Sequence, residues 1–188
     1  MSKKAVFIIA QNNFRDEELL VPKEILVKNG ITVKVAAKIK SKAIGKLGAE
    51  IQPDLALIEV KADDFEAIIF VGGSGASQYF DDISALNLAR DFFGAKKITA
   101  GICIGPSILA NAGVLMGKTA TAFPSQEDNL KNKGADYTGM AVEIDGRVIT
   151  GKDPNAAKEF GEKLVNLLTE LDWFLLVNYN WKTIKDIF

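Results

Sequence analysis

The only cysteine of the sequence, Cys103, lies in a segment whose spacing favours nucleophilic chemistry. Residues 101–105 read Gly-Ile-Cys-Ile-Gly, a G-x-nucleophile-x-G pattern with cysteine in the place of serine. A nucleophile on a sharp turn between a strand and a helix needs neighbours without side chains, and Gly101 and Gly105 leave that room. Pro106 suits the first turn of the following helix, where its missing N–H costs nothing. The N–H groups and dipole at that helix start would favour a Cys103 thiolate.

A second glycine-rich segment, Val-Gly-Gly-Ser-Gly at residues 71–75, follows a predicted buried strand. Its backbone can point N–H groups into a cleft, so we expect Gly72 and Ser74 to line a pocket. With the N–H of Ile104, the N–H of Gly73 would form a two-donor oxyanion hole. A simple turn after the strand is equally compatible with this segment. The segment is too short for a P-loop and no Lys-Ser/Thr follows it, so we do not expect phosphate binding.

The sequence contains no histidine. Histidine is the commonest general base near neutral pH and the usual zinc and copper ligand. Ser–His–Asp and Cys–His catalysis within one chain are therefore excluded. A zinc site would need carboxylates plus the single thiolate, so we expect neither a metal nor another cofactor.

The composition is that of an ordinary globular chain. With 188 residues, 48% of them hydrophobic, the chain can bury one sizeable core. Its net charge of −1 predicts neither a nucleic-acid nor a membrane partner. The apolar runs are too short to span a bilayer, and the apolar run after Met1–Lys4 is too short for a signal peptide. One cysteine cannot form an internal disulfide and fits a reducing compartment, so we predict a cytoplasmic protein.

Short β-branched runs alternate with longer amphipathic stretches, which predicts an α/β fold: a mostly parallel sheet with helices on both faces. Pro22 interrupts the first predicted helix, which either starts near Val21 or is kinked. Either way, Glu18 lies in a first-turn-like position just beyond the first strand, at the edge where open α/β sheets bind ligands. The predicted strands are Ala5–Ala10, Ile31–Ala37, Ala67–Val71 and Ile98–Ile102; the predicted helices are Asp16–Asn29, Ile83–Phe93, Pro106–Asn111 and Pro154–Thr169; Ser41–Val60 is expected to hold a small antiparallel excursion, Gly72–Ser77 a loop and Val142–Thr150 a hairpin.

Together these residues resemble the ThiJ/PfpI superfamily, which shares the flavodoxin-like three-layer fold of class I glutamine amidotransferases. The resemblance implies that Cys103 is the reactive cysteine and that Glu18 is a buried glutamate sharing a proton with it. It also implies that the N–H groups of Gly73 and Ile104 are the oxyanion donors. Taken alone, Glu18 would be interpreted as a solvated helix charge. The resemblance runs from about Lys4 to Leu168 and is carried by the Phe14–Glu18–Pro22 segment, the Gly72-Gly73 loop, the Ala100–Pro106 elbow and Thr150–Pro154.

Two departures from the superfamily concern histidine. The PfpI-type proteases carry a histidine directly after the cysteine, where this chain has Ile104. The parkinsonism-associated deglycase and redox sensor has a later histidine, in a segment that aligns with Thr121–Pro124 and places Phe123 at that position. We therefore expect Phe123 in the pocket, and a Cys–His protease is the least favoured of the family activities.

Three functions are compatible with these residues. The favoured one is an enzyme of glyoxalase or deglycase type, in which Cys103 adds to a small reactive carbonyl compound and Glu18 relays the proton. The alternative is a redox-responsive or chaperone-like stress protein, in which an oxidant converts a low-pKa Cys103 to a sulfinate beside a protonated carboxyl. The third is a weak protease- or amidase-like hydrolase or a catalytically degenerate binding module.

The end of the sequence is unusually aromatic. We separate residues 1–170, the ThiJ/PfpI-like domain, from residues 171–188, an extension that packs on its own domain or on a partner subunit. Members of the superfamily commonly form dimers or higher oligomers, so we expect a homo-oligomer. The aromatic residues of the extension are Trp173, Phe174, Tyr179, Trp181 and Phe188.

Overall fold

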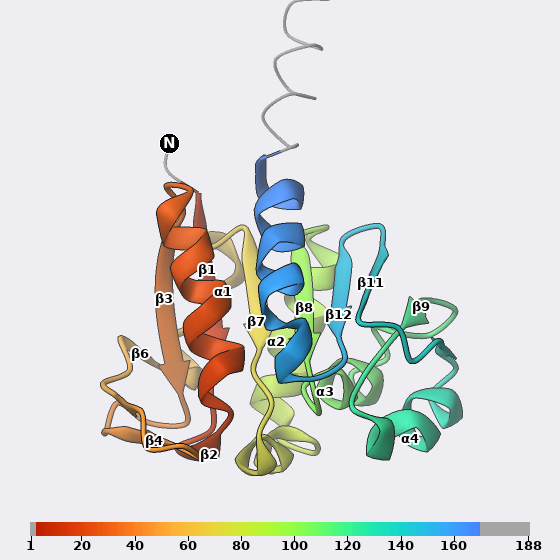
Figure 1. The fold of residues 1–188 in the computed structure, drawn as a ribbon, viewed down its shortest axis with the longest axis horizontal. Coiled ribbons are helices and arrows are strands. Elements are labelled where there is room, and N and C mark those ends of the chain that lie inside the picture. The colour runs from red at the N-terminus through yellow and green to blue at the C-terminus, as the bar shows by residue number, and fades with distance from the viewer. Residues whose placement is uncertain (1–2, 170–188) are drawn as a thin grey trace, which may run out of the picture.

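The computed structural model describes residues 3–169 and shows a mostly parallel seven-stranded sheet surrounded by helices (Figure 1). Neighbouring strands are parallel except for the pair at one edge. This architecture confirms the predicted α/β, flavodoxin-like fold. In spatial order the strands are β11 (Val142–Asp145), β12 (Val148–Gly151), β8 (Ile98–Ile102), β7 (Ala67–Phe70), β1 (Lys4–Ile8), β3 (Thr32–Ala37) and β6 (Leu55–Ala56), and β11 is the antiparallel one.

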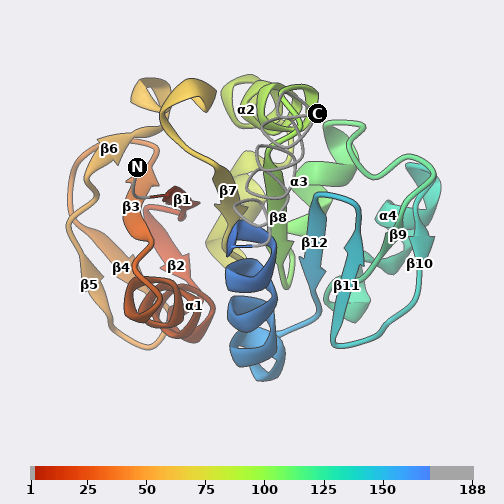
Figure 2. The same cartoon turned by 90° about the horizontal axis from the view of Figure 1, so that it is seen from above.

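Helices cover both faces of the sheet (Figure 2). The helix α1 (Asp16–Lys28) and the last helix, residues 157–169, pack on one face, while α2 (Ile83–Gly94) and α3 (Pro106–Asn111) pack on the other. Successive side chains of β1 enter the two apolar layers alternately, so the strand is buried on both faces. No helix within residues 3–169 has the length and apolar run needed to cross a bilayer.

The first helix begins at Asp16, as predicted, and continues through Pro22. The alternative start near Val21 is therefore wrong. Pro22 has no N–H to donate to the carbonyl of Glu18, four residues earlier. Glu18 nevertheless lies in the first helical turn, as predicted.

Several short elements were not predicted, because two to six residues give too little periodicity to recognise. The predicted antiparallel excursion exists as β4 and β5, but β2 also joins it. The segment predicted as a loop after β7 forms a 3₁₀ helix, Ser74–Tyr79. The aromatic extension lies outside the described residues. The short elements are β2 (Asn12–Phe14), β4 (Ala43–Gly45), β5 (Glu50–Ile51), β9 (Thr119–Ala120), α4 (Glu127–Asn132) and β10 (Asp136–Tyr137).

The strand order reverses beside β1. From β1 the chain passes to β3 on one side, whereas the later strands β7 and β8 follow on the other side. Open α/β sheets bind ligands in the crevice at the carboxyl ends of the strands next to such a reversal. The first turn of α1, the loop after β7 and the turn after β8 all lie at this edge (Figure 1).

Candidate active site

Cys103 lies on the turn between β8 and α3 with a left-handed backbone conformation, φ 61°. This conformation is strained for a residue other than glycine and persists only when the surrounding structure holds it. The amide of Cys103 donates to the carbonyl oxygen of Gly151 at 2.9 Å, and its carbonyl oxygen accepts from the amide of Phe123 at 2.8 Å. These hydrogen bonds to two other segments hold the predicted elbow.

The glycines on either side of the elbow have no room for side chains. A Cβ on Gly105 would lie 2.3 Å from the carbonyl oxygen of Phe70, and one on Gly101 would lie 2.8 Å from the nitrogen of Pro106. Any side chain at these positions would push the end of β8 away from α3 or β7. Both positions therefore require glycine because a side chain would clash there, as the sequence pattern indicated.

The glycine loop after β7 packs tightly on the segment that precedes α1. A Cβ on Gly73, which has a φ of 90°, would lie 2.4 Å from the nitrogen of Arg15. The amide of Arg15 in turn donates to the carbonyl oxygen of Gly72 at 3.0 Å. The loop is therefore more than a simple turn, because its packing joins the start of α1 to the end of β7.

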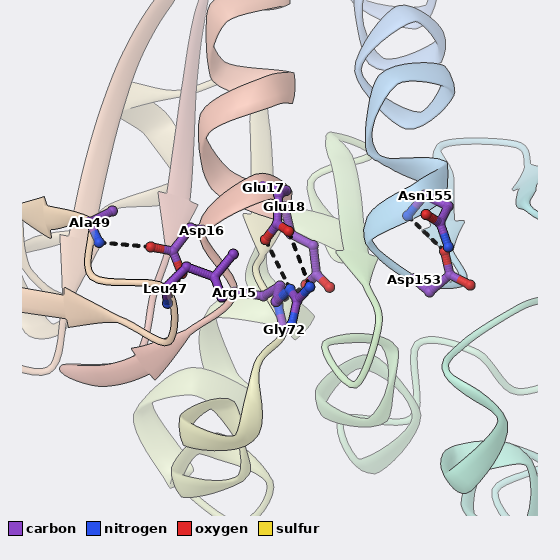
Figure 3. A network of polar contacts seen from close by, with 9 residues as sticks. All are labelled: Arg15, Asp16, Glu17, Glu18, Leu47, Ala49, Gly72, Asp153 and Asn155. Carbon is purple, nitrogen blue, oxygen red and sulfur yellow. Dashed lines mark hydrogen bonds and ion pairs between the residues drawn. The ribbon is translucent and has the colours of Figure 1, made fainter.

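Glu18 is fully buried and faces the thiol of Cys103. Its Oε2 accepts a hydrogen bond from the amide of Gly72 at 2.9 Å (Figure 3). Its Oε1 is buried and has no nitrogen or oxygen partner among the described residues. Glu18 therefore lies where the family resemblance placed it, and the interpretation as a solvated helix charge is wrong.

Burial raises the pKa of Glu18 to about 7, because the ionised carboxylate loses its hydration. Hydrogen bonding to Cys103 and to the amide of Gly72, and the charge of Arg15, oppose this rise in the pKa. A carboxyl group whose pKa lies near neutrality can both accept and return a proton at the pH of most cells.

Burial, followed by the charge of Glu18, raises the pKa of the Cys103 thiol to about 12. The amides of Gly73 and Ile104 donate hydrogen bonds to the sulfur and lower its pKa, but their effect is smaller. The prediction of a low thiol pKa is therefore wrong, because Cys103 is only 8% exposed and shares its surroundings with a carboxylate. Since each charge disfavours the other, the pair holds at least one proton at neutral pH.

A cavity of about 250 Å³ adjoins the sulfur. As predicted, Ser74 and Phe123 line it, and Phe123 is 41% exposed. Gly72, predicted to line the pocket, instead lies behind the carboxyl of Glu18 and donates its N–H to it. Four further lining residues were missed by sequence reasoning, namely Arg15, Lys46, Ser125 and Pro154.

Two of the missed residues are cations. Arg15 pairs with Glu17 at 2.9 Å (Figure 3), and its position three residues before Glu18 could have indicated it. Lys46 lies in the turn between β4 and β5, and no motif in the sequence connects it to Cys103. Within residues 3–169, no group of three or more metal-ligating side chains could hold a metal ion.

The chemistry of this arrangement follows from its groups. A thiol faces a carboxyl that can accept its proton, and the backbone N–H groups of Gly73 and Ile104 are hydrogen-bonded to the sulfur. Such a site can form and resolve a covalent bond between sulfur and a carbonyl carbon.

Comparisons with known proteins agree with this fold. The model of the DJ-1/PfpI family matches residues 3–167. A protein from Pyrococcus abyssi named a deglycase is 33% identical over 163 residues, which are 87% of this chain and 98% of that protein. The crystal structure of a ThiJ/PfpI domain protein from Brachyspira murdochii has a TM-score of 0.88 and 32% identity, covering 90% of this chain and 98% of that one. The crystal structure of DJ-1beta from Drosophila melanogaster has a TM-score of 0.83 and 30% identity, covering 94% of this chain and 98% of that one.

Proposed function

Because this chain belongs to the DJ-1/PfpI family, we propose that it is a cysteine-dependent enzyme that acts on reactive carbonyl compounds, as a glyoxalase or deglycase does. The reaction depends on Cys103 and Glu18 and uses no histidine. The observation that carries this proposal is the buried Glu18 carboxyl, with a pKa of about 7, facing the sulfur beside a cavity. Relatives that are named deglycases, at 31% to 33% identity, support it.

The first step with a 2-oxoaldehyde is addition of sulfur to the aldehyde carbon. As the carbon–sulfur bond forms, the thiol proton passes to the Glu18 carboxylate and the carbonyl electron pair moves onto oxygen. The amides of Gly73 and Ile104 stabilise the charge on that oxygen. Glu18 then returns the proton, which gives a neutral hemithioacetal on Cys103.

The second step rearranges the bound compound without an external oxidant. The hydrogen on the former aldehyde carbon leaves as a proton to Glu18 and returns to the neighbouring carbon. The proton of the hemithioacetal hydroxyl moves to the oxygen of the neighbouring carbonyl, which becomes a hydroxyl. The first carbon is oxidised to a thioester by the same two electrons that reduce the second. Water cleaves the thioester, which releases a 2-hydroxy acid and restores the thiol.

The side chains at the two histidine positions of the family support a single-base mechanism. Ile104 and Phe123 both line the cavity and neither can carry a proton. Glu18 is the lining residue with an ionisable group directly facing the sulfur. It must therefore serve each proton transfer in turn.

A second candidate function is oxidation sensing at Cys103. The Oε1 of Glu18 has no nitrogen or oxygen partner among the described residues, and this favours it, because a protonated carboxyl could donate to an oxygen of a sulfinate. Each of two peroxide molecules would add one oxygen to the sulfur and leave as water. We rank this function second, because the raised pKa of Cys103 leaves little of the thiolate that peroxide requires.

The test is turnover of methylglyoxal to lactate by the wild type, Cys103→Ser and Glu18→Gln. We expect product from the wild type and a loss of about 100-fold or more in both variants, as for removal of a nucleophile or general base. Glu24→Gln, on the exposed side of α1 and paired with Lys28, is the matched control and should retain full turnover. Turnover that survives Cys103→Ser would overturn the proposal, and sulfinate formation in peroxide without any turnover would favour the sensor.

A further inference from the structure

We infer that the cavity selects carbonyl compounds that end in a carboxylate, and that Lys46 binds this negative group. The choice of a carbonyl compound rests on the proposed function, whereas the preference for an anion is a property of the cavity itself. The inference starts from the charges around the cavity and from the way in which the chain holds Lys46.

Lys46 supplies a positive charge that no described side chain neutralises. It lines the cavity, is exposed, and forms no ion pair with a described residue. The other lining cation, Arg15, is already paired with Glu17. Among the described lining residues Glu18 is the one carboxyl, and it is buried and faces the sulfur. The cavity therefore has an unbalanced cation on the side of the β4–β5 turn.

The turn that carries Lys46 is fixed by a buried carboxylate. Asp16 is 4% exposed, and its two oxygens accept hydrogen bonds from the amides of Leu47 and Ala49, each at 2.8 Å (Figure 3). A Cβ on Gly45 would lie 2.3 Å from Oδ1 of Asp16, so the turn packs directly on the carboxylate. The amide of Lys46 itself donates to the carbonyl oxygen of Phe14 at 2.8 Å.

This arrangement ties Lys46 to the reacting groups. Asp16 and Glu18 belong to the same turn of α1, so one helix start positions both the turn of Lys46 and the carboxyl at the sulfur. The backbone of Lys46 is thus held in place although its side chain is exposed. A lysine ammonium is a compact charge suited to a carboxylate, and a cavity of about 250 Å³ suits a compound of a few carbons.

Two alkylating reagents of nearly equal size test the anion preference without turnover. Iodoacetate carries a carboxylate and iodoacetamide is neutral, and each transfers its two-carbon group to the Cys103 sulfur with loss of iodide. Intact mass follows the reaction, because the chain has one cysteine. The quantity compared is the rate constant with iodoacetate divided by that with iodoacetamide. We expect this ratio to be higher for Cys103 of the wild type than for glutathione. In Lys46→Met the ratio should fall about tenfold, which corresponds to the loss of one charge-assisted hydrogen bond. Lys46→Arg should keep the ratio.

Lys133→Met is the matched control, since it removes the same charge from an exposed lysine that does not line the cavity. Its alkylation ratio should equal that of the wild type. An unchanged ratio in Lys46→Met, a wild-type ratio no higher than that of glutathione, or failure of both reagents to label Cys103 would each overturn the inference.

Turnover provides a second comparison. The compound 4,5-dioxopentanoate is a 2-oxoaldehyde that ends in a carboxylate, and 2-oxopentanal is its neutral counterpart. We expect the wild type to have about tenfold higher kcat/KM for the acid, and Lys46→Met to lose that advantage. Equal kcat/KM values in the wild type would overturn the inference. If the alkylation ratio behaves as expected and neither compound is consumed, the proposed function fails and the anion preference stands.

Discussion

The Glu18 carboxyl and the Cys103 side chain meet at the α-carbon of Gly72. A Cβ on Gly72 would lie 2.5 Å from Oε2 of Glu18 and 2.6 Å from the Cβ of Cys103. The amide of the same glycine holds Oε2 at 2.9 Å. The end of β7 therefore provides both the space and the hydrogen bond that bring the carboxyl to the sulfur.

Gly72→Ala should separate this pair. Because the added methyl group has no space, we expect a loss of about 1–3 kcal/mol in the free energy of unfolding, as for an overpacked core. Turnover and alkylation of Cys103 should fall with it. Gly94→Ala is the control, since no atom other than its chain neighbours and its own helix backbone lies within 4 Å of the place that a methyl group would take, and it should lower neither property. Full stability together with full turnover in Gly72→Ala would contradict the geometry.

The raised pKa of Glu18 predicts how stability depends on pH. The carboxyl loses its proton near pH 4.5 in the unfolded chain and near pH 7 in the folded one. Between these values the unfolded state has lost a proton that the folded state keeps, so stability falls as the pH rises and levels off above about pH 7. Across this pH range the free energy of unfolding falls by about 3 kcal/mol relative to that of Glu18→Gln, which has no titrating carboxyl at this position. Chemical denaturation of both proteins from pH 4 to 8 measures the difference, and parallel curves would disprove the raised pKa.

Removal of the Glu18 charge should make the thiol easier to ionise. That charge is one of the causes that raise the pKa of Cys103, and Glu18→Gln keeps the shape of the side chain without it. We expect the pKa of Cys103 to be lower in Glu18→Gln than in the wild type, while turnover is lost. The ultraviolet absorbance of the thiolate measures this titration for a single cysteine, with Glu24→Gln as the control. A thiol pKa that stays the same or rises in Glu18→Gln would show that the two groups are not coupled.

Asp16→Asn should loosen the turn that carries Lys46. An amide can accept only one of the two N–H groups that the carboxylate binds, so one buried donor is left unpaired, at a cost of about 1–3 kcal/mol. The preference of Cys103 for iodoacetate should fall in the same variant. Glu17→Gln changes a half-exposed ion pair in the same helical turn and should cost less than about 1 kcal/mol. Equal stability of Asp16→Asn and the wild type would argue against the role of this carboxylate.

The sequence was most informative where a structural feature depends on residues that are close together in the chain. The elbow around Cys103 is local, because the strained φ and the two glycines lie within five residues. The strands β7 and β8 were also predicted closely, since both are buried, mostly apolar runs. Glu18 required the family resemblance, because nothing in its own helix shows that a sulfur from the end of β8 lies opposite it.

The features that were missed depend on contacts between distant segments. Lys46 lies at the cavity because its turn packs on the Asp16 carboxylate, about 30 residues earlier in the chain. Gly72 was assigned to the pocket, but its place behind Glu18 follows from the packing of β7 against α1. The thiol pKa was predicted in the wrong direction, because burial and a facing carboxylate are properties of the folded site and outweigh the helix start.

The most direct test of the central claim is rapid-quench intact mass spectrometry of the wild type during turnover of a 2-oxoaldehyde. Covalent catalysis by the Cys103–Glu18 pair predicts an adduct with the mass of the substrate on Cys103, formed at least as fast as product and absent in Cys103→Ser. Product released without any adduct on Cys103 would contradict it.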